Sequence, residues 1–257
     1  MKTPLTLVAA LAFALVLADE AKAPEPHLLT FKAADGSEAT AIYYPPVGHK
    51  APGILCFHAL GRSSEAWGEF PARLQAAGYA VLSVTLRGHP ESGPKRARGM
   101  TWIRFEIPQF RDMVRDVEAA RACLASQREV DGFHLALLGE EFGANLALAG
   151  GQSPTFRAAI LLTPRVDARG IPGPEALAAF GDRPCLAVAS ADDAQGIAAL
   201  DALQSAAKGK FDSDRVSTDA SDADYGAAML SDPDKPGLSE RILAWLKSAL
   251  PASGPRP

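Results

Sequence analysis

The stretch that decides the fold is residues 135–148, LALLGEEFGANLAL. Its first four residues are apolar without interruption, which is typical of a strand buried on both faces of a sheet. A turn bounded by glycines, GEEFG, follows, and a run of small and apolar residues then favours a helix. A buried strand that passes through a tight turn into a helix is the repeating unit of parallel α/β sheets.

Outward from this unit, strand-like and helix-like runs alternate along the chain. Asp35-Gly36 predicts a hairpin between strands at 27–32 and 40–44. Further strands are expected at 53–58, 79–86, 133–138, 158–162, 184–190 and 211–217, and helices at 66–77, 105–127, 142–150, 197–207 and 238–250. This order predicts a mostly parallel sheet with an N-terminal hairpin and helices on both faces. The functional cleft of such a sheet lies beyond the carboxyl ends of its strands.

The composition is that of an ordinary globular chain. Of the 257 residues, 47% are apolar and 22% are charged, which argues against disorder and against a disulfide-rich mini-protein. The net charge of −4 provides no basic footprint for nucleic acid. Three cysteines without a C-x-x-C pair argue against zinc, iron–sulfur and thioredoxin-type chemistry, and buried free thiols are expected for all three. No cofactor and no metal is expected.

The first residues predict an export signal. Lys2 precedes a mostly apolar run over residues 5–18, which is short for a membrane span and suited to a signal-peptide core. Cleavage is expected after Ala18, with Ala23 as the alternative, which leaves no stable membrane span. A retained N-terminal anchor is the competing interpretation. We therefore expect an exported protein, periplasmic or secreted, with one domain over residues 27–250 and a disordered tail over 251–257.

Five segments carry a resemblance to a known family. They are FHALGRSSEAW (57–67), LQAAGYAVLSVTLRGHPESG (74–93), LALLGEEFGANLAL (135–148), PCLAVASADDAQG (184–196) and DADYGAAML (222–230). In this order, they make the chain resemble the α/β-hydrolase superfamily, in particular small exported proteins similar to dienelactone hydrolases and serine esterases. The resemblance implies an α/β-hydrolase fold. The short stretch between 162 and 184 allows a minimal lid with one helix at 174–180.

The family's catalytic positions hold other residues here. The elbow motif G-x-S-x-G has Glu141 where the family has the serine nucleophile. Tyr225 stands at the position of the histidine, and the acid falls at Asp193, with Asp192 as the alternative one residue away. The resemblance implies that the backbone N–H groups of Leu60 and Phe142 form the oxyanion hole.

These departures change the expected chemistry. Tyrosine has an ordinary pKa near 10 and is a poor base at neutral pH, so nothing at that position activates a nucleophile. Two neighbouring carboxylates, Glu141 and Asp193, are also expected to repel each other. The sequence therefore predicts a catalytically degenerate homologue that binds a small molecule in a shallow cleft, or a partner. An active hydrolase with a rearranged site using Glu141 or Asp193 is the alternative, and a purely structural role is a third; oligomeric state stays open.

Overall fold

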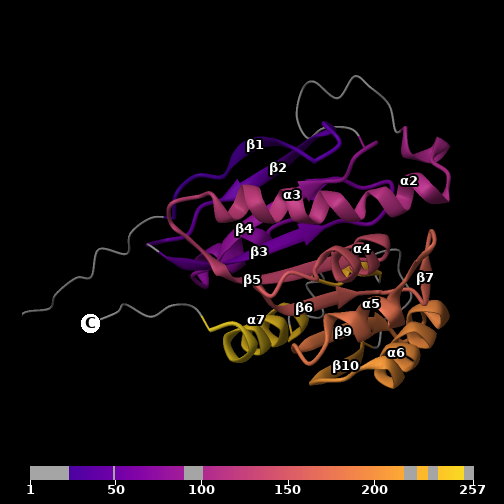
Figure 1. Cartoon of the computed structure of the whole chain (residues 1–257). Coiled ribbons are helices and arrows are strands. Elements are labelled where there is room, and N and C mark those ends of the chain that lie inside the picture. The colour runs from indigo at the N-terminus through magenta and orange to yellow at the C-terminus, as the bar shows by residue number, and fades with distance from the viewer. Residues whose placement is uncertain (1–22, 49, 90–100, 217–224, 231–236, 252–257) are drawn as a thin grey trace, which may run out of the picture.

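The computed structural model describes residues 23–48, 50–89, 101–216, 225–230 and 237–251 (Figure 1). The expected signal peptide at 1–18 lies outside these ranges, as does the expected tail beyond residue 251. None of the helices within them is both long and apolar enough to cross a membrane.

Within the described residues, eight strands form one sheet in the order β1-β2-β4-β3-β5-β6-β9-β10. The strands are β1 (His27–Lys32), β2 (Glu38–Tyr44), β3 (Ala51–Phe57), β4 (Ala80–Thr85), β5 (Val130–Glu140), β6 (Phe156–Leu162), β9 (Cys185–Ser190) and β10 (Phe211–Val216). Only β2 pairs antiparallel, with β1 and with β4, and the other pairs among them are parallel. The predicted mostly parallel sheet with an N-terminal hairpin is confirmed.

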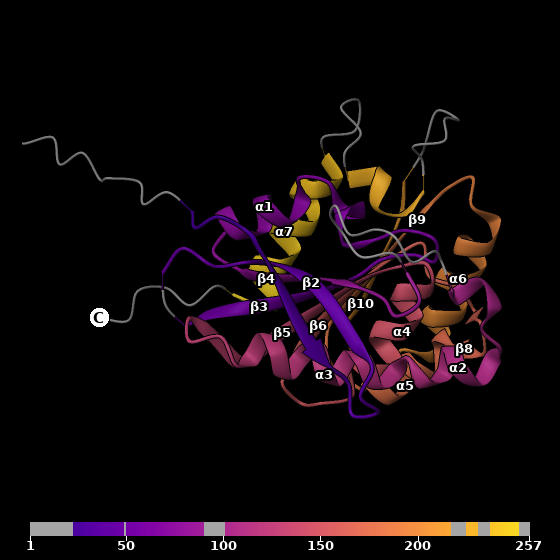
Figure 2. The same cartoon turned by 90° about the horizontal axis from the view of Figure 1, so that it is seen from above.

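Helices cover both faces of the sheet, as Figure 2 shows. On one face lie α3 (Val114–Ala125), α4 (Phe142–Gly150), α5 (Gly173–Phe180) and α6 (Ala194–Ala206), and on the other lie α1 (Phe70–Ala76) and α7 (Gly237–Ala249). Every residue of β3, β4 and β9 is buried, because both faces of these strands are covered. Continuous apolar runs in the sequence thus correspond to central strands.

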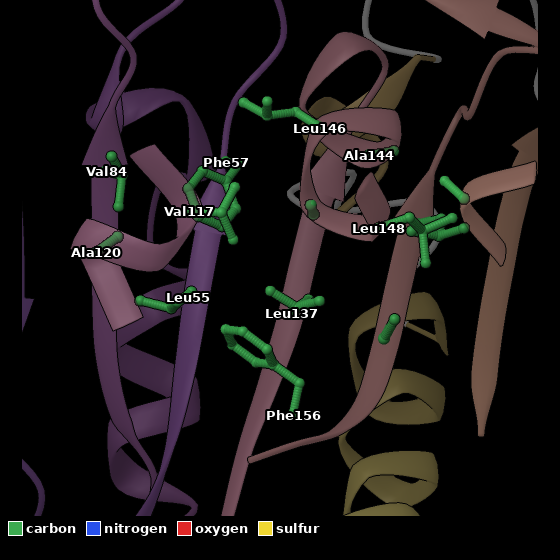
Figure 3. Close-up of a cluster of buried hydrophobic side chains, with 14 of the residues drawn as sticks. Leu55, Phe57, Val84, Val117, Ala120, Leu137, Ala144, Leu146, Leu148 and Phe156 are labelled. Carbon is green, nitrogen blue, oxygen red and sulfur yellow. The ribbon is translucent and has the colours of Figure 1, made fainter. Parts of the chain in front are cut away.

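The core between the sheet and α3–α4 is closely packed. Leu55, Phe57 and Leu137 from the strands meet Val117 of α3 and Leu148 of α4 there (Figure 3). Glycine at the end of α4 lets the two helices approach. A Cβ at Gly150 would lie 2.4 Å from Cβ of Val117, too close for any side chain. This packing holds α4, and with it the turn before α4, firmly against the sheet.

The single helix expected over 105–127 is two helices, α2 (Ile107–Asp112) and α3, and that prediction is wrong. At Met113 the hydrogen bonds tighten to the i→i+3 type, from Met113 N–H to the Phe110 carbonyl. The break lets the residues before and after it contact different parts of the chain. Before it, the Phe110 ring packs edge-on against Phe142 of α4, and after it, buried Asp116 accepts two hydrogen bonds from Arg87.

Smaller differences concern the other predicted elements. The helix expected from residue 66 is a 3-10 turn, η1 (Ser64–Trp67), followed by α1, because Gly68 adopts φ 55° between them. The expected lid helix is α5, and a hairpin of β7 (Asp167–Ala168) and β8 (Ile171–Pro172) precedes it. All three cysteines are free thiols, but only Cys56 and Cys185 are buried; Cys123 is half-buried at the helix surface.

Candidate functional site

The turn between β5 and α4 consists of one residue, Glu141. Its backbone has φ 50° and ψ −111°, a conformation that costs energy for any residue with a Cβ. The turn is tight because glycines stand on both sides. A Cβ at Gly139 would lie 2.4 Å from Cα of Ala144, and one at Gly143 would lie 2.1 Å from the carbonyl oxygen of Phe57. The surrounding packing therefore holds Glu141 in this strained geometry.

The carboxylate of Glu141 turns back onto the start of α4. Its Oε2 accepts the backbone N–H of Phe142 over 2.6 Å, and its side chain is 32% exposed. Phe142 is one of the two residues expected to supply an oxyanion-hole donor. Here that donor is occupied by a carboxylate of the same turn. Leu60, the other expected donor, is half-buried against the core in the loop after β3.

Asp193 is the residue that caps α6. Its Oδ1 accepts the N–H of Gly196 over 3.0 Å, and its side chain is 8% exposed. Asp192, the alternative acid, is exposed. A buried carboxylate needs a compensating partner, and Oδ2 of Asp193 finds one in Nη1 of Arg165 at 2.7 Å.

Arg165 joins the two acidic residues. Its Nε lies 3.9 Å from Oε1 of Glu141, while its Nη1 donates to Asp193. The repulsion expected between these two carboxylates is thus replaced by attraction to a guanidinium that both contact. Asn145 of α4 fixes the backbone of this arginine: its Oδ1 accepts the N–H of Arg165 over 3.1 Å, and its Nδ2 donates to the Arg165 carbonyl over 2.9 Å.

Tyr225 stands apart from this cluster. It directly precedes the 3-10 helix η3 (Gly226–Leu230), and it is 45% exposed. In the described part of the chain, no hydrogen bond joins it to Glu141 or to Asp193. The structure therefore brings Glu141 and Asp193 together through Arg165, and it does not bond Tyr225 to either.

The histidines near the site are bound by backbone groups. His58 is fully buried; its Nε2 accepts the N–H of Leu86 over 3.0 Å, and its Nδ1 lies 2.7 Å from the Ala59 carbonyl. Burial lowers the pKa of His58 to about 3, so the ring is neutral. His89 accepts the N–H of Gly61 at Nε2, and burial lowers its pKa too. Both rings hold the loop after β3, which leaves neither ring positioned as a general base.

Residues 48–218, more than half of the chain, match the family model described as serine aminopeptidase, S33. The chain belongs to this family, within the α/β-hydrolase superfamily. No curated protein matches the sequence.

Solved structures of other α/β hydrolases share the fold. A dienelactone hydrolase from Anabaena variabilis superposes with a TM-score of 0.70 at 16% identity, covering 88% of this chain and 99% of that one. An acetyl xylan esterase from Paenibacillus sp. R4 gives 0.68 at 15% identity, with 88% of each chain covered. A thermophilic carboxylesterase cloned from a metagenomic library gives 0.65 at 16% identity, covering 89% and 90%. At these identities, the likeness concerns the fold alone.

Arg165 is the site residue of this α/β hydrolase that sequence reasoning missed. A usable signal was present, because the segment Thr163-Pro164-Arg165 directly follows β6, at the edge where two acids were expected. Two carboxylates at one edge, one of them buried, require a cation, and Arg165 lies three residues after the end of β6.

Two other features bear on ligands. Among the described residues, no three side chains of His, Cys, Asp and Glu gather in a way that could hold a metal ion. A hollow of about 590 Å³ lies at the amino ends of β3 and β5, and it is lined by Pro24, Pro45, Pro46, Gly48, Arg128 and Glu129. Since Glu141 lies at the opposite, carboxyl end of β5, this hollow is distinct from the shallow cleft predicted beside the turn.

Proposed function

We propose that this α/β hydrolase is a catalytically degenerate homologue that binds a small molecule, or a partner, at the carboxyl edge of its sheet. The observation that carries the proposal is the contact of Arg165 with both Glu141 and Asp193. A serine hydrolase needs a nucleophile, a base and an acid that orients the base. Here a carboxylate replaces the nucleophile, and the acid is bound to a guanidinium.

The state of the oxyanion donors supports the same conclusion. An oxyanion hole stabilises developing negative charge only if its N–H groups are free to receive it. The carboxylate of Glu141 already accepts the Phe142 N–H. An ester carbonyl would have to displace a charged acceptor held on the same turn. Binding remains feasible, because the Glu141 side chain is 32% exposed and can accept a hydrogen bond from a ligand.

The alternative is an active hydrolase with a rearranged site using Glu141 or Asp193. Glu141 could attack an electrophilic carbon and form an ester, but release of that ester needs a base for water. Asp193 is 8% exposed and both its oxygens accept hydrogen bonds, which supports a structural role for it. A purely structural or interaction role is the remaining possibility. Detectable binding of a small molecule would favour the first proposal over it.

The purified protein tests the proposal directly. We expect no labelling by a fluorophosphonate probe and no hydrolysis of p-nitrophenyl acetate above the buffer rate, with an active serine esterase as the positive control. Stoichiometric labelling at any serine would overturn the proposal. Turnover that is lost in Glu141→Gln or Asp193→Asn would instead establish the rearranged hydrolase.

We also propose that the mature protein is exported and begins after residue 18 or residue 23. The apolar run over residues 5–18 and the small residues at both sites support this. N-terminal sequencing of protein isolated from the producing cells is expected to find Asp19 or Pro24 as the first residue. A start at Met1 would contradict export with cleavage and would support a retained anchor.

A further inference from the structure

The hollow of about 590 Å³ at the amino ends of β3 and β5 has the make-up of a second binding site. Of its lining residues, Pro45 and Pro46 are buried, whereas Pro24 and Arg128 are exposed. Pro45 and Pro46 thus form an apolar floor, and two charged residues, Arg128 and Glu129, stand beside it. Sites for small molecules have this volume and combine apolar surface with a few polar or charged groups.

Hydrogen bonds fix the walls of this hollow. Gln75 of α1 is 4% exposed, and its Nε2 donates to the carbonyl of Pro24 over 2.8 Å and to that of Pro45 over 2.6 Å. The N–H of Ala51, the first residue of β3, donates to the carbonyl of Glu129 over 2.8 Å. The ring of a proline also fixes one of its backbone dihedrals. The hollow is therefore present before a ligand arrives, which lowers the cost of binding.

The carboxylate of Glu129 is held in place and keeps capacity for further donors. Its Oε1 accepts the hydroxyl of Tyr43, a buried side chain, over 3.0 Å. Within the described ranges, no cationic side chain forms an ion pair with Glu129. An ionised carboxylate accepts about four hydrogen bonds, so its Oε2 is available to a ligand that carries N–H groups.

Arg128 brings the opposite charge to the hollow. Among the residues that the structure describes, no ion pair or hydrogen bond engages its guanidinium, not even with Glu129 beside it in the chain. A guanidinium stays protonated and binds a carboxylate through two parallel hydrogen bonds. Because Arg128 is exposed, its side chain is free to turn toward a carboxylate that enters the hollow.

We propose that this hollow binds a free α-amino acid with an apolar side chain. The carboxylate of the ligand pairs with Arg128, its ammonium group pairs with Glu129, and its side chain packs on the proline floor. The two protein charges belong to consecutive residues, and the two charged groups of an α-amino acid are bonded to one carbon. A ligand with a single charge would leave one protein charge without a partner. The site is separate from the carboxyl edge, so either site can exist without the other.

Three compounds with the same phenyl group test which charges the hollow recognises. L-phenylalanine carries both charges, hydrocinnamate only the carboxylate, and phenethylamine only the ammonium group. In an NMR titration of the full chain at neutral pH, we expect L-phenylalanine to shift the amide of Gly48, which lines the hollow. It should bind about tenfold more tightly than either singly charged compound. The amide of Gly61, in the loop after β3, should not move. No shift at Gly48, or equal affinity for a singly charged compound, would overturn the proposal.

Variants separate the two charged contacts. Arg128→Gln should weaken binding of L-phenylalanine and hydrocinnamate about tenfold and leave phenethylamine unchanged. Glu129→Gln should weaken L-phenylalanine and phenethylamine and leave hydrocinnamate unchanged. Arg104→Gln, which removes an exposed arginine outside the hollow, is the control for net charge and should change nothing.

Glu141→Gln tests the other edge of the sheet and should bind L-phenylalanine as the wild type does. Binding that is unchanged in Arg128→Gln, or that is lost in Glu141→Gln, would place the ligand outside the hollow and refute the proposal. The comparison of the three compounds on the wild-type protein decides the proposal even if a variant does not fold.

Discussion

Nη1 of Arg165 lies 2.7 Å from Oδ2 of Asp193, so the carboxylate that the sequence assigns as the acid of a triad has a guanidinium as its partner. An imidazole in that position could exchange a proton with a nucleophile at neutral pH, whereas a guanidinium stays protonated. The same arginine also approaches Glu141. The pairing of Arg165 with Asp193 therefore bears both on the proposed loss of catalysis and on the stability of the buried carboxylate.

Arg165→Gln is expected to lower the free energy of unfolding by about 2 kcal/mol, because it leaves the buried Asp193 without its cation. Urea unfolding at neutral pH measures this loss. Arg104→Gln is the control: Arg104 is an exposed arginine in the 3-10 helix η2 (Trp102–Arg104), and its loss should cost less than about 0.5 kcal/mol. Equal losses in the two variants would contradict a bridging role for Arg165.

Gly226→Ala is expected to lower the free energy of unfolding by about 3 kcal/mol, because the new Cβ overlaps Oε1 of Glu140. Gly36→Ala is the control. Gly36, in the exposed hairpin turn, also has a positive φ, 82°, but a Cβ there meets nothing within 4 Å, so only the backbone cost of about 1 kcal/mol is expected. If both variants lose the same amount, the contact between η3 and Glu140 does not contribute to stability.

His58 should make the fold sensitive to acid. Its folded pKa, about 3, lies below the ordinary histidine value of about 6.5, so its stabilising contribution is complete above pH 6.5 and is lost as the pH falls toward 3. Between pH 7 and pH 5 the expected loss is about 2 kcal/mol. Urea unfolding at several pH values should show this slope in the wild type and a shallower slope in His58→Gln. Parallel slopes would mean that the pKa of His58 in the fold is close to its ordinary value.

A serine hydrolase site can be rebuilt only if Arg165 is removed as well. Glu141→Ser with Tyr225→His and Arg165→Ala frees both the Phe142 N–H and Asp193, and weak hydrolysis of p-nitrophenyl acetate is expected. The double variant that keeps Arg165 should stay at the wild-type rate, because Asp193 remains paired. Each single change should do nothing, since nucleophile and base act as a unit. Equal activity in the double and triple variants would show that Arg165 does not block the acid.

The sequence by itself predicted the parts of the fold that depend on local pattern. The apolar run before Gly139 and the small residues after Glu141 predicted β5 and α4, and the bounds of α4 agree with the prediction. The hairpin of β1 and β2 followed from Asp35-Gly36. A strand buried on both faces must be continuously apolar, and a tight turn must contain glycine, so each of these features is visible within a few residues.

Only the tertiary structure decided which side chains from different elements contact one another. The break at Met113, the pairing of Arg165 with Asp193, and the contact of Glu140 with Ala227 each join residues that are distant in the chain. No periodicity encodes such pairs, because they arise where loops from different strands meet at one edge of the sheet. There, burial makes every charged or polar group require a partner, and the fold determines which partner is within reach.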